Sequence, residues 1–296
     1  MNILISGASG LLGRALTRSL ESAGHSVIKL SRKGDDTLPP CWDPANDFID
    51  LGSKPFEVVI HLAGENISNG RWSTERKKKI MESRIKGTAL LANALARSTV
   101  KPKVMITASA VGYYGNRGDA IMNESAASGG GFLAEVCREW EKAAESASNS
   151  GIRVVNTRFG MILSVHGGAL EKMLTPFRMG LGGNIGSGRQ YISWVSIDDV
   201  IGAMKFIIEN DSISGPVNTV APTPLTNREF TKILAGALHR PAFMTLPAFM
   251  ARLIFGEMAD ELLLSSTRAV PRKLQEAGYR FQDPDLQGLF EKWFNK

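Results

Sequence analysis

The sequence has little cysteine and no ordered set of metal ligands. Only two cysteines, Cys41 and Cys137, occur in 296 residues, which excludes a disulfide framework. The four histidines show no metal-ligand spacing, so no metal site is predicted.

Long hydrophobic runs are also missing. The most apolar late segment, 246–255, is interrupted by Pro247 and Arg252, and no segment approaches the roughly eighteen apolar residues of a membrane span. The first expected strand begins at residue 3, which leaves no room for a signal peptide. We therefore expect a cytoplasmic protein with no membrane contact; an organelle matrix after removal of a transit peptide is the alternative.

Neither sign of charge dominates. Lysine and arginine number 35 against 29 acidic residues, and the one basic run, 76–79, is typical of a solvated helix face. No nucleic-acid-binding module accompanies this run, so nucleic acid is not expected as a partner.

What the sequence does contain is a glycine-rich turn near its start. An apolar run at 3–5 leads to Gly7, Gly10 and Gly13, and an amphipathic helix is expected over 12–23. In this order the glycines permit a tight turn, a close approach of backbone to a pyrophosphate, and packing of the helix, whose N-terminus attracts phosphate. The pattern predicts a dinucleotide site made by Gly7, Ser9, Gly10, Leu11, Leu12 and Gly13. A glycine-rich turn without a ligand is the alternative.

The next strand, expected over 27–30, indicates which dinucleotide. NAD-specific folds carry an acid after this strand, whereas this chain has Ser31, Arg32 and Lys33. Arg32 can bind a 2′-phosphate with two hydrogen bonds and Ser31 adds a donor, which favours NADP(H). Alternatively, Arg32 and Lys33 are ordinary solvated residues. Asp35 and Asp36 lie too far beyond the strand to be the first choice as ribose ligands.

Strand and helix patterns alternate through the first 165 residues, as in an α/β doubly wound parallel (Rossmann) sheet. Further strands are expected over 58–62, 104–107 and 154–157, and helices over 74–97, 132–148 and up to 208. We expect a dinucleotide-binding domain over 1–165, with 192–221 returning to it, and a smaller C-terminal substrate lobe over 166–191 and 222–296. The strand ends predict cofactor contacts from Leu62, Ala63, Gly64, Thr107 and Ile162.

Several of these segments resemble the extended short-chain dehydrogenase/reductases. The resemblance rests on the three glycines, on 59–64, Gly87-Thr88, Arg158-x-Gly160 and 194–200. More narrowly, 64–67, 71–72, 83–84, 186–190 and the C-terminal lobe resemble an atypical branch of nucleoside-diphosphate-sugar epimerases that ends in a domain of unknown function. The resemblance implies NADP(H) and an unidentified small-molecule substrate, and it suggests a homodimer through the helices of 74–97 and 132–148.

The resemblance fails at the catalytic pair. The family carries Tyr-x-x-x-Lys, in which the lysine cation lowers the pKa of the tyrosine that transfers the proton. Alignment on Glu141 puts Leu133 and Cys137 at these positions, and no tyrosine in the chain is followed by lysine four residues later.

Other groups are therefore candidates for the chemistry. Ser109 is the candidate hydroxyl donor, and Tyr113, with its neighbour Tyr114, is a candidate proton donor or a packed aromatic. Glu65, followed by Asn66, faces substrate or pairs locally with Arg71. Arg84 binds the cofactor or is a surface charge. Gln190 and Trp194 line the cleft, with a core position as the alternative for Trp194.

Two functions follow from these residues. The first is an NADP(H)-dependent oxidoreductase or epimerase with rearranged proton-transfer groups. The second is a catalytically silent protein that senses NADPH and acts on a partner. Burial of Glu65, Ser109 or a loop tyrosine beside the nicotinamide would favour the enzyme.

Overall fold

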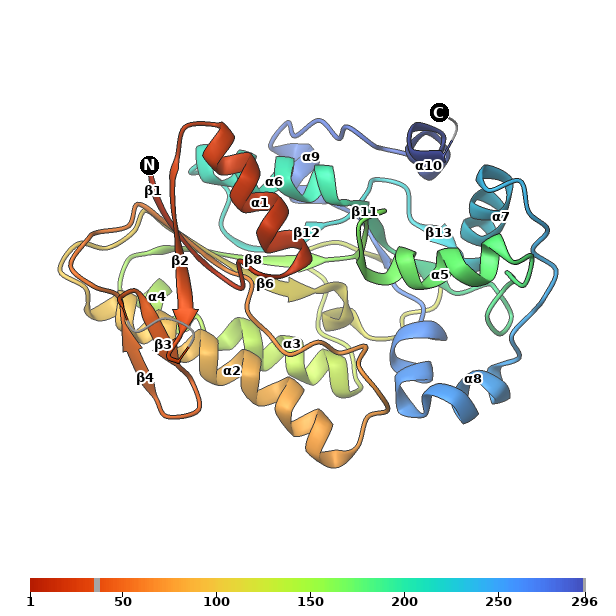
Figure 1. Ribbon diagram of the computed structural model, residues 1–296, viewed down its shortest axis with the longest axis horizontal. Coiled ribbons are helices and arrows are strands. Elements are labelled where there is room, and N and C mark those ends of the chain that lie inside the picture. Colours follow the sequence, from red (N-terminus) through yellow and green to blue (C-terminus); the bar gives the residue numbers. More distant parts are fainter. Residues whose placement is uncertain (35–37, 295–296) are drawn as a thin grey trace.

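The computed structural model describes residues 1–34 and 38–294 and is built on one large, mainly parallel sheet (Figure 1). Its strand order is β12-β8-β6-β5-β1-β2-β3-β4, and only the β3–β4 pair is antiparallel. The strands of this sheet are β1 (Asn2–Ser6), β2 (Ser26–Arg32), β3 (Cys41–Asp43), β4 (Phe48–Asp50), β5 (Val58–His61), β6 (Val104–Ala110), β8 (Arg153–Phe159) and β12 (Gly215–Thr219). The expected doubly wound sheet is therefore confirmed.

Alternating apolar residues build a core on each face of the sheet. The helices on the two faces are α1 (Leu11–Ser22) and α6 (Ile197–Glu209) on one, and α2 (Thr74–Arg97), α3 (Phe132–Lys142) and α4 (Glu145–Asn149) on the other (Figure 1). Ile3 and Ile5 belong to one cluster with residues of α1 and α6, whereas Leu4 belongs to a second cluster with residues of α2 and α4. This alternation follows from the two-residue period of a strand.

A third apolar cluster joins the elements beyond β8. These later elements are β9 (Met161–Leu163), α5 (Gly168–Arg178), β10 (Tyr191–Ile192), β11 (Trp194–Ser196), β13 (Leu225–Thr226), α7 (Asn227–Ala237), α8 (Ala248–Phe255), the π-helix η2 (Ala259–Leu263), β14 (Arg268–Ala269), α9 (Arg272–Glu276) and α10 (Leu286–Phe294). The cluster includes Leu174 of α5, Phe230 of α7 and Phe290 of α10. The short 3-10 helix η1 (Val111–Tyr114) and β7 (Ile121–Met122) lie between β6 and α3.

Several predicted boundaries differ from those in the structure, and two of the differences matter for the site. The helix expected over 132–148 is divided into α3 and α4 by a turn at Ala143 and Ala144. The strand expected to end at Thr107 continues to Ala110, because its small residues extend the ladder with Thr157, Arg158 and Phe159 of β8. This extension moves the rim of the sheet three residues along the chain.

Candidate functional site

The glycine-rich turn lies where the strand order reverses, between β1 and β5. Gly7 has a φ of +72°, and a Cβ there would lie 2.8 Å from the backbone nitrogen of Ala63. A Cβ on Gly13 would lie 2.2 Å from the carbonyl oxygen of Gly7. Both positions therefore require glycine, and the N-terminus of α1 is held against the carboxyl ends of β1 and β5. This is the cradle that a dinucleotide needs.

The turn is open where the phosphates would bind. Ser9 and Gly10 are exposed, and Gly10 is the N-cap of α1, whose first turn carries no acidic residue. Of the other expected contacts, Leu11 packs near Gly167 and Gly168, and Leu12 packs against the core. The helix N-terminus thus offers N–H groups and a positive dipole end to an anion.

The two basic residues at the end of β2, Arg32 and Lys33, have different surroundings. Arg32 is exposed and Ser31 is half-buried, whereas the ammonium of Lys33 lies 4.1 Å from the centre of the Phe48 ring. The Lys33 cation is therefore engaged with an aromatic face, and the Arg32 side chain is in the open. Asp35 and Asp36 lie outside the described residues.

The rim after β5 forms the first charged group of the site. Leu62 and Ala63 are half-buried and Gly64 is exposed. The carboxylate of Glu65 accepts from Arg76 at 2.7 Å. The expected local pair with Arg71 is wrong, because Arg71 donates to the carbonyl oxygen of Leu253.

Arg84 is not a surface charge. Its guanidinium lies 4.9 Å from the centre of the Trp140 ring and donates to the carbonyl oxygens of Glu65 and Ile80, both at 3.0 Å. It also lies against Gly64. Burial lowers the pKa of Arg84 from its ordinary value. The guanidinium therefore stands behind the rim, on the side of the sheet that carries α3.

The second charged group is a buried network at the end of β6. The hydroxyl of Ser109, which is 2% exposed, donates to Glu141 at 2.7 Å. Glu141 also accepts two bonds from Arg158, each 2.8 Å long. Arg158 in turn donates to the Tyr114 hydroxyl, which donates to Asn218 at 2.7 Å. This network fixes the direction of every polar group in it.

The loop tyrosines differ in accessibility. Tyr114 is fully buried, and its burial raises the pKa of its phenol. Tyr113 is half-buried, and the Arg158 guanidinium lies 3.5 Å from the centre of its ring. Thr107 lies inside the sheet rather than at its rim, and its hydroxyl donates to Asn156 at 2.6 Å. Its expected contact with the cofactor stays a prediction.

The positions of the missing catalytic pair are packed. Leu133 and Cys137 are 8% and 3% exposed, and both side chains lie against Gly112 of η1. Burial raises the pKa of Cys137 to about 11, so its thiol stays protonated at neutral pH. Neither side chain can supply a cation.

The segment of residues 246–264, which holds α8 and η2 and which we call the arm, contacts this packed region. The carboxylate of Glu261 accepts from the backbone nitrogens of Phe132 and Leu133 at 3.2 and 3.0 Å. Lys77 of α2 pairs with Glu257 at 2.9 Å. Met258 joins an apolar cluster with Trp72, Ile80 and Leu133. The arm is thus held at the N-terminus of α3.

Trp194 and Gln190 make structural contacts, whereas Ile162 stays a predicted cofactor contact. Trp194 is fully buried, and its indole nitrogen donates to the carbonyl oxygen of Thr223. The Gln190 amide donates to the carbonyl oxygens of Ile185 and Leu263. Ile162 is half-buried in β9 and pairs with Val195 of β11.

Sequence reasoning missed three charged residues of this region. From the sequence, Arg158 is recognised only within the Arg158-x-Gly160 motif, and Glu141 only as the residue on which the helix is aligned with the family. In the structure the two side chains form the central ion pair. Glu261 carried no signal, because its partners lie 128 and 129 residues away in the chain. Within the described residues, no cluster of potential ligands is suited to a metal, and no helix is long and apolar enough to cross a membrane.

Comparison with known families gives two matches. Residues 3–219 match the NAD dependent epimerase/dehydratase family, and residues 246–292 match a domain of unknown function, DUF1731. The second match begins at the first residue of the arm.

Individual relatives extend over nearly the whole chain. Epimerase family protein Mb2239 of Mycobacterium bovis is 42% identical over 281 residues, which cover 94% of this chain and 93% of the relative. The crystal structure of human epimerase family protein SDR39U1 (isoform 2) with NADPH has a TM-score of 0.91 and 33% identity, with 100% of each chain covered. MoeE5 in complex with UDP-glucose and NAD has a TM-score of 0.74 over 100% of this chain and 98% of its own, but 16% identity, so it supports the fold alone.

Proposed function

Because the chain belongs to the NAD dependent epimerase/dehydratase family, we propose that it binds NADP(H) in the crevice between β1 and β5 and exchanges a hydride with a small carbonyl or hydroxyl substrate. The observation that carries the proposal is the fit of the glycine turn, where Gly7 and Gly13 leave no room for a Cβ. The human relative crystallised with NADPH supports the same cofactor.

The preference for NADP(H) rests on Arg32. Its exposed guanidinium follows β2, where it would bind the 2′-phosphate with two charge-assisted hydrogen bonds. Lys33 is the matched control, because its ammonium already lies over Phe48. We expect Arg32→Ala to weaken NADPH binding about tenfold or more while NADH binding changes little.

Fluorescence titration of NADPH and NADH tests this assignment. Lys33→Ala should leave the ratio of the two affinities close to that of the unchanged protein. Equal loss of NADPH affinity in both variants would mean that general positive charge, rather than Arg32, selects the cofactor.

The chemistry requires a proton donor in place of the missing tyrosine. When bound, the nicotinamide gives or takes up a hydride. Tyr113 is suited to donate this proton, because its phenol is partly exposed and the Arg158 cation is stacked on its ring. Ser109 and Glu141 position Arg158 rather than touch substrate, since the Ser109 hydroxyl is already donated to Glu141.

Arg84 would supply the cation that the missing lysine normally provides. Its guanidinium lies against Gly64 of the rim and stacks on Trp140 of α3. From this position it would bind the ribose next to the nicotinamide. Glu65, held by Arg76, is the remaining polar group at the same rim.

Substrate screening tests the enzyme. NADPH oxidation is followed by absorbance against a panel of aldehydes, ketones and nucleotide sugars, and Tyr113→Phe keeps the stacked ring while removing the hydroxyl. For a substrate so found, the variant should lower kcat about 100-fold or more with unchanged NADPH affinity. An unchanged kcat would remove Tyr113 from the mechanism.

The silent NADPH sensor is the second candidate, and the packing of Leu133 and Cys137 favours it. A sensor would turn over no member of the panel, yet NADPH would change the protection of the arm against proteolysis. The homodimer through α2 and α3 and the cytoplasmic location stay predictions; analytical ultracentrifugation tests the first.

A further inference from the structure

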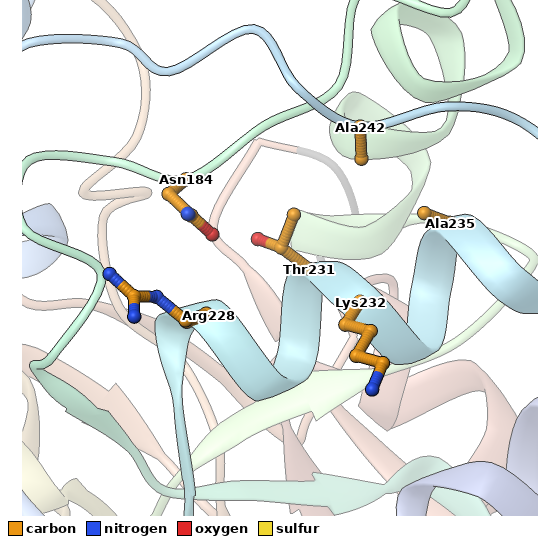
Figure 2. Close-up of a pocket in the computed structure, with 6 residues that line it drawn as sticks. All are labelled: Asn184, Arg228, Thr231, Lys232, Ala235 and Ala242. Atoms are coloured by element: carbon orange, nitrogen blue, oxygen red, sulfur yellow. The ribbon is translucent and has the colours of Figure 1, made fainter.

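A hollow of about 240 Å³ lies beside α7, apart from the dinucleotide crevice. Asn184 reaches it from the segment between α5 and β10, and Ala242 from the segment between α7 and α8 (Figure 2). Its other lining residues come from α7 and are Arg228, Thr231, Lys232 and Ala235. It shares no residue with the glycine turn or the rim of β5, so it is a separate feature of the molecule.

The α7 residues are spaced to present one face. Arg228, Thr231, Lys232 and Ala235 follow one another at intervals of three, one and three residues, which brings their side chains to one side of a helix. Two are cations, and none of the six lining residues is acidic. The neighbouring Glu229 accepts from the backbone nitrogen and hydroxyl of Thr226 instead, both at 2.8 Å. The hollow is therefore positively charged.

Thr231 adds a buried hydroxyl without a partner. The residue is 3% exposed, and its Oγ1 has no hydrogen-bond partner among residues 1–34 and 38–294. Figure 2 shows this oxygen directed across the hollow toward the side-chain amide of Asn184. Buried hydroxyls are normally satisfied, because an unmet one is costly. Thr231 therefore has an unused hydrogen-bond donor on the side of the hollow that faces Asn184.

We propose that this hollow binds the phosphate group of a small molecule, either free phosphate or a phosphate monoester. The Thr231 hydroxyl and the Asn184 amide can hydrogen-bond phosphate oxygens, and the Arg228 and Lys232 cations on the same helix attract the charge of a phosphate dianion. The volume is below the roughly 300–1,000 Å³ of pockets that hold drug-sized ligands, which excludes a dinucleotide. Arg228 also borders a second hollow of about 300 Å³, which is lined by Arg189 and by the acidic Asp119.

An NMR titration of NADPH-saturated, full-length protein tests the site, because the cofactor then occupies the glycine turn. Inorganic phosphate and glycerol 3-phosphate are added in separate arms, with chloride at equal ionic strength as the reference. We expect saturable shifts of the amides of 182–188 and 226–235. Shifts with both ligands support a monoester site, and shifts with inorganic phosphate alone support a free-ion site.

Four variants separate a built site from general attraction. Arg228→Gln and Lys232→Gln should each weaken phosphate binding about tenfold or more. Thr231→Val, which keeps the shape, should weaken it about threefold to tenfold without lowering Tm. Lys78→Gln, which removes an exposed lysine of α2, is the matched control and should leave the affinity unchanged.

Two results would overturn the proposal. Equal phosphate affinity in Arg228→Gln, Lys232→Gln and Lys78→Gln would show nonspecific attraction to a basic protein. Shifts confined to residues 7–13 would show that phosphate enters the dinucleotide crevice alone. A failure of NADPH binding appears separately in the cofactor's fluorescence and does not alter the readout at α7.

Discussion

Replacing Glu141 with glutamine should strongly destabilise the protein, because Glu141 belongs to a buried ion pair. The Arg158 and Glu141 side chains are 3% and 12% exposed and share two hydrogen bonds of 2.8 Å. Glutamine keeps the shape but removes the negative charge, and its NH₂ group would face the donors of Arg158. Leaving one charge of a buried pair uncompensated typically costs about 3–5 kcal/mol.

Urea unfolding followed by tryptophan fluorescence measures this loss. The midpoint should fall by an amount equivalent to about 3–5 kcal/mol, while the slope with urea stays the same because the exposed surface is unchanged. Glu82→Gln is the control, since its ion pair with Lys86 is exposed and contributes about 0.5 kcal/mol or less. A loss below about 1 kcal/mol in Glu141→Gln would refute the reasoning, because the pair would then be effectively solvated.

Three further predictions concern separate parts of the molecule. Gly13→Ala should weaken NADPH binding more than Gly10→Ala in a fluorescence titration, because the new Cβ lies 2.2 Å from the Gly7 carbonyl oxygen in the first case and 3.3 Å in the second; equal effects would contradict this. Glu261→Gln should speed backbone hydrogen exchange in the arm and the first turn of α3, because the carboxylate that accepts from two amides is neutralised; unchanged exchange would mean that apolar contacts alone hold the arm. Burial lowers the pKa of His61 from 6.5 to about 4, so the unfolded chain takes up a proton that the folded chain refuses, and the free energy of unfolding should fall by up to about 3 kcal/mol between pH 6.5 and 4. In urea unfolding, His61→Gln should lose this part of the pH dependence, and an unaltered pH profile would count against His61.

Residues that interact through local periodicity could be predicted from the sequence. The run 3–5 alternates between two core clusters, and the helix over 74–97 has the predicted bounds. Its start is marked by Ser73, whose side chain accepts from the backbone nitrogen of Arg76. The end of β6 could not be predicted in this way, because Ala108, Ser109 and Ala110 have little strand preference of their own. Pairing with β8 decides their conformation.

The polar part of the site depends on contacts between elements that are distant in the sequence. Ser109, Glu141 and Arg158 come from β6, α3 and β8, and only the sheet register and the packing of α3 bring them together. A motif search shows that tyrosine and lysine are absent at positions 133 and 137. It cannot show which residues pack around these two positions. In the structure, η1 packs on these two positions, and Glu261 of the arm accepts from the backbone nitrogens of Phe132 and Leu133. The two positions at which the family carries its catalytic pair and the amides bound by Glu261 therefore lie on the same helix, α3, which is contacted by the segment matched by the domain of unknown function.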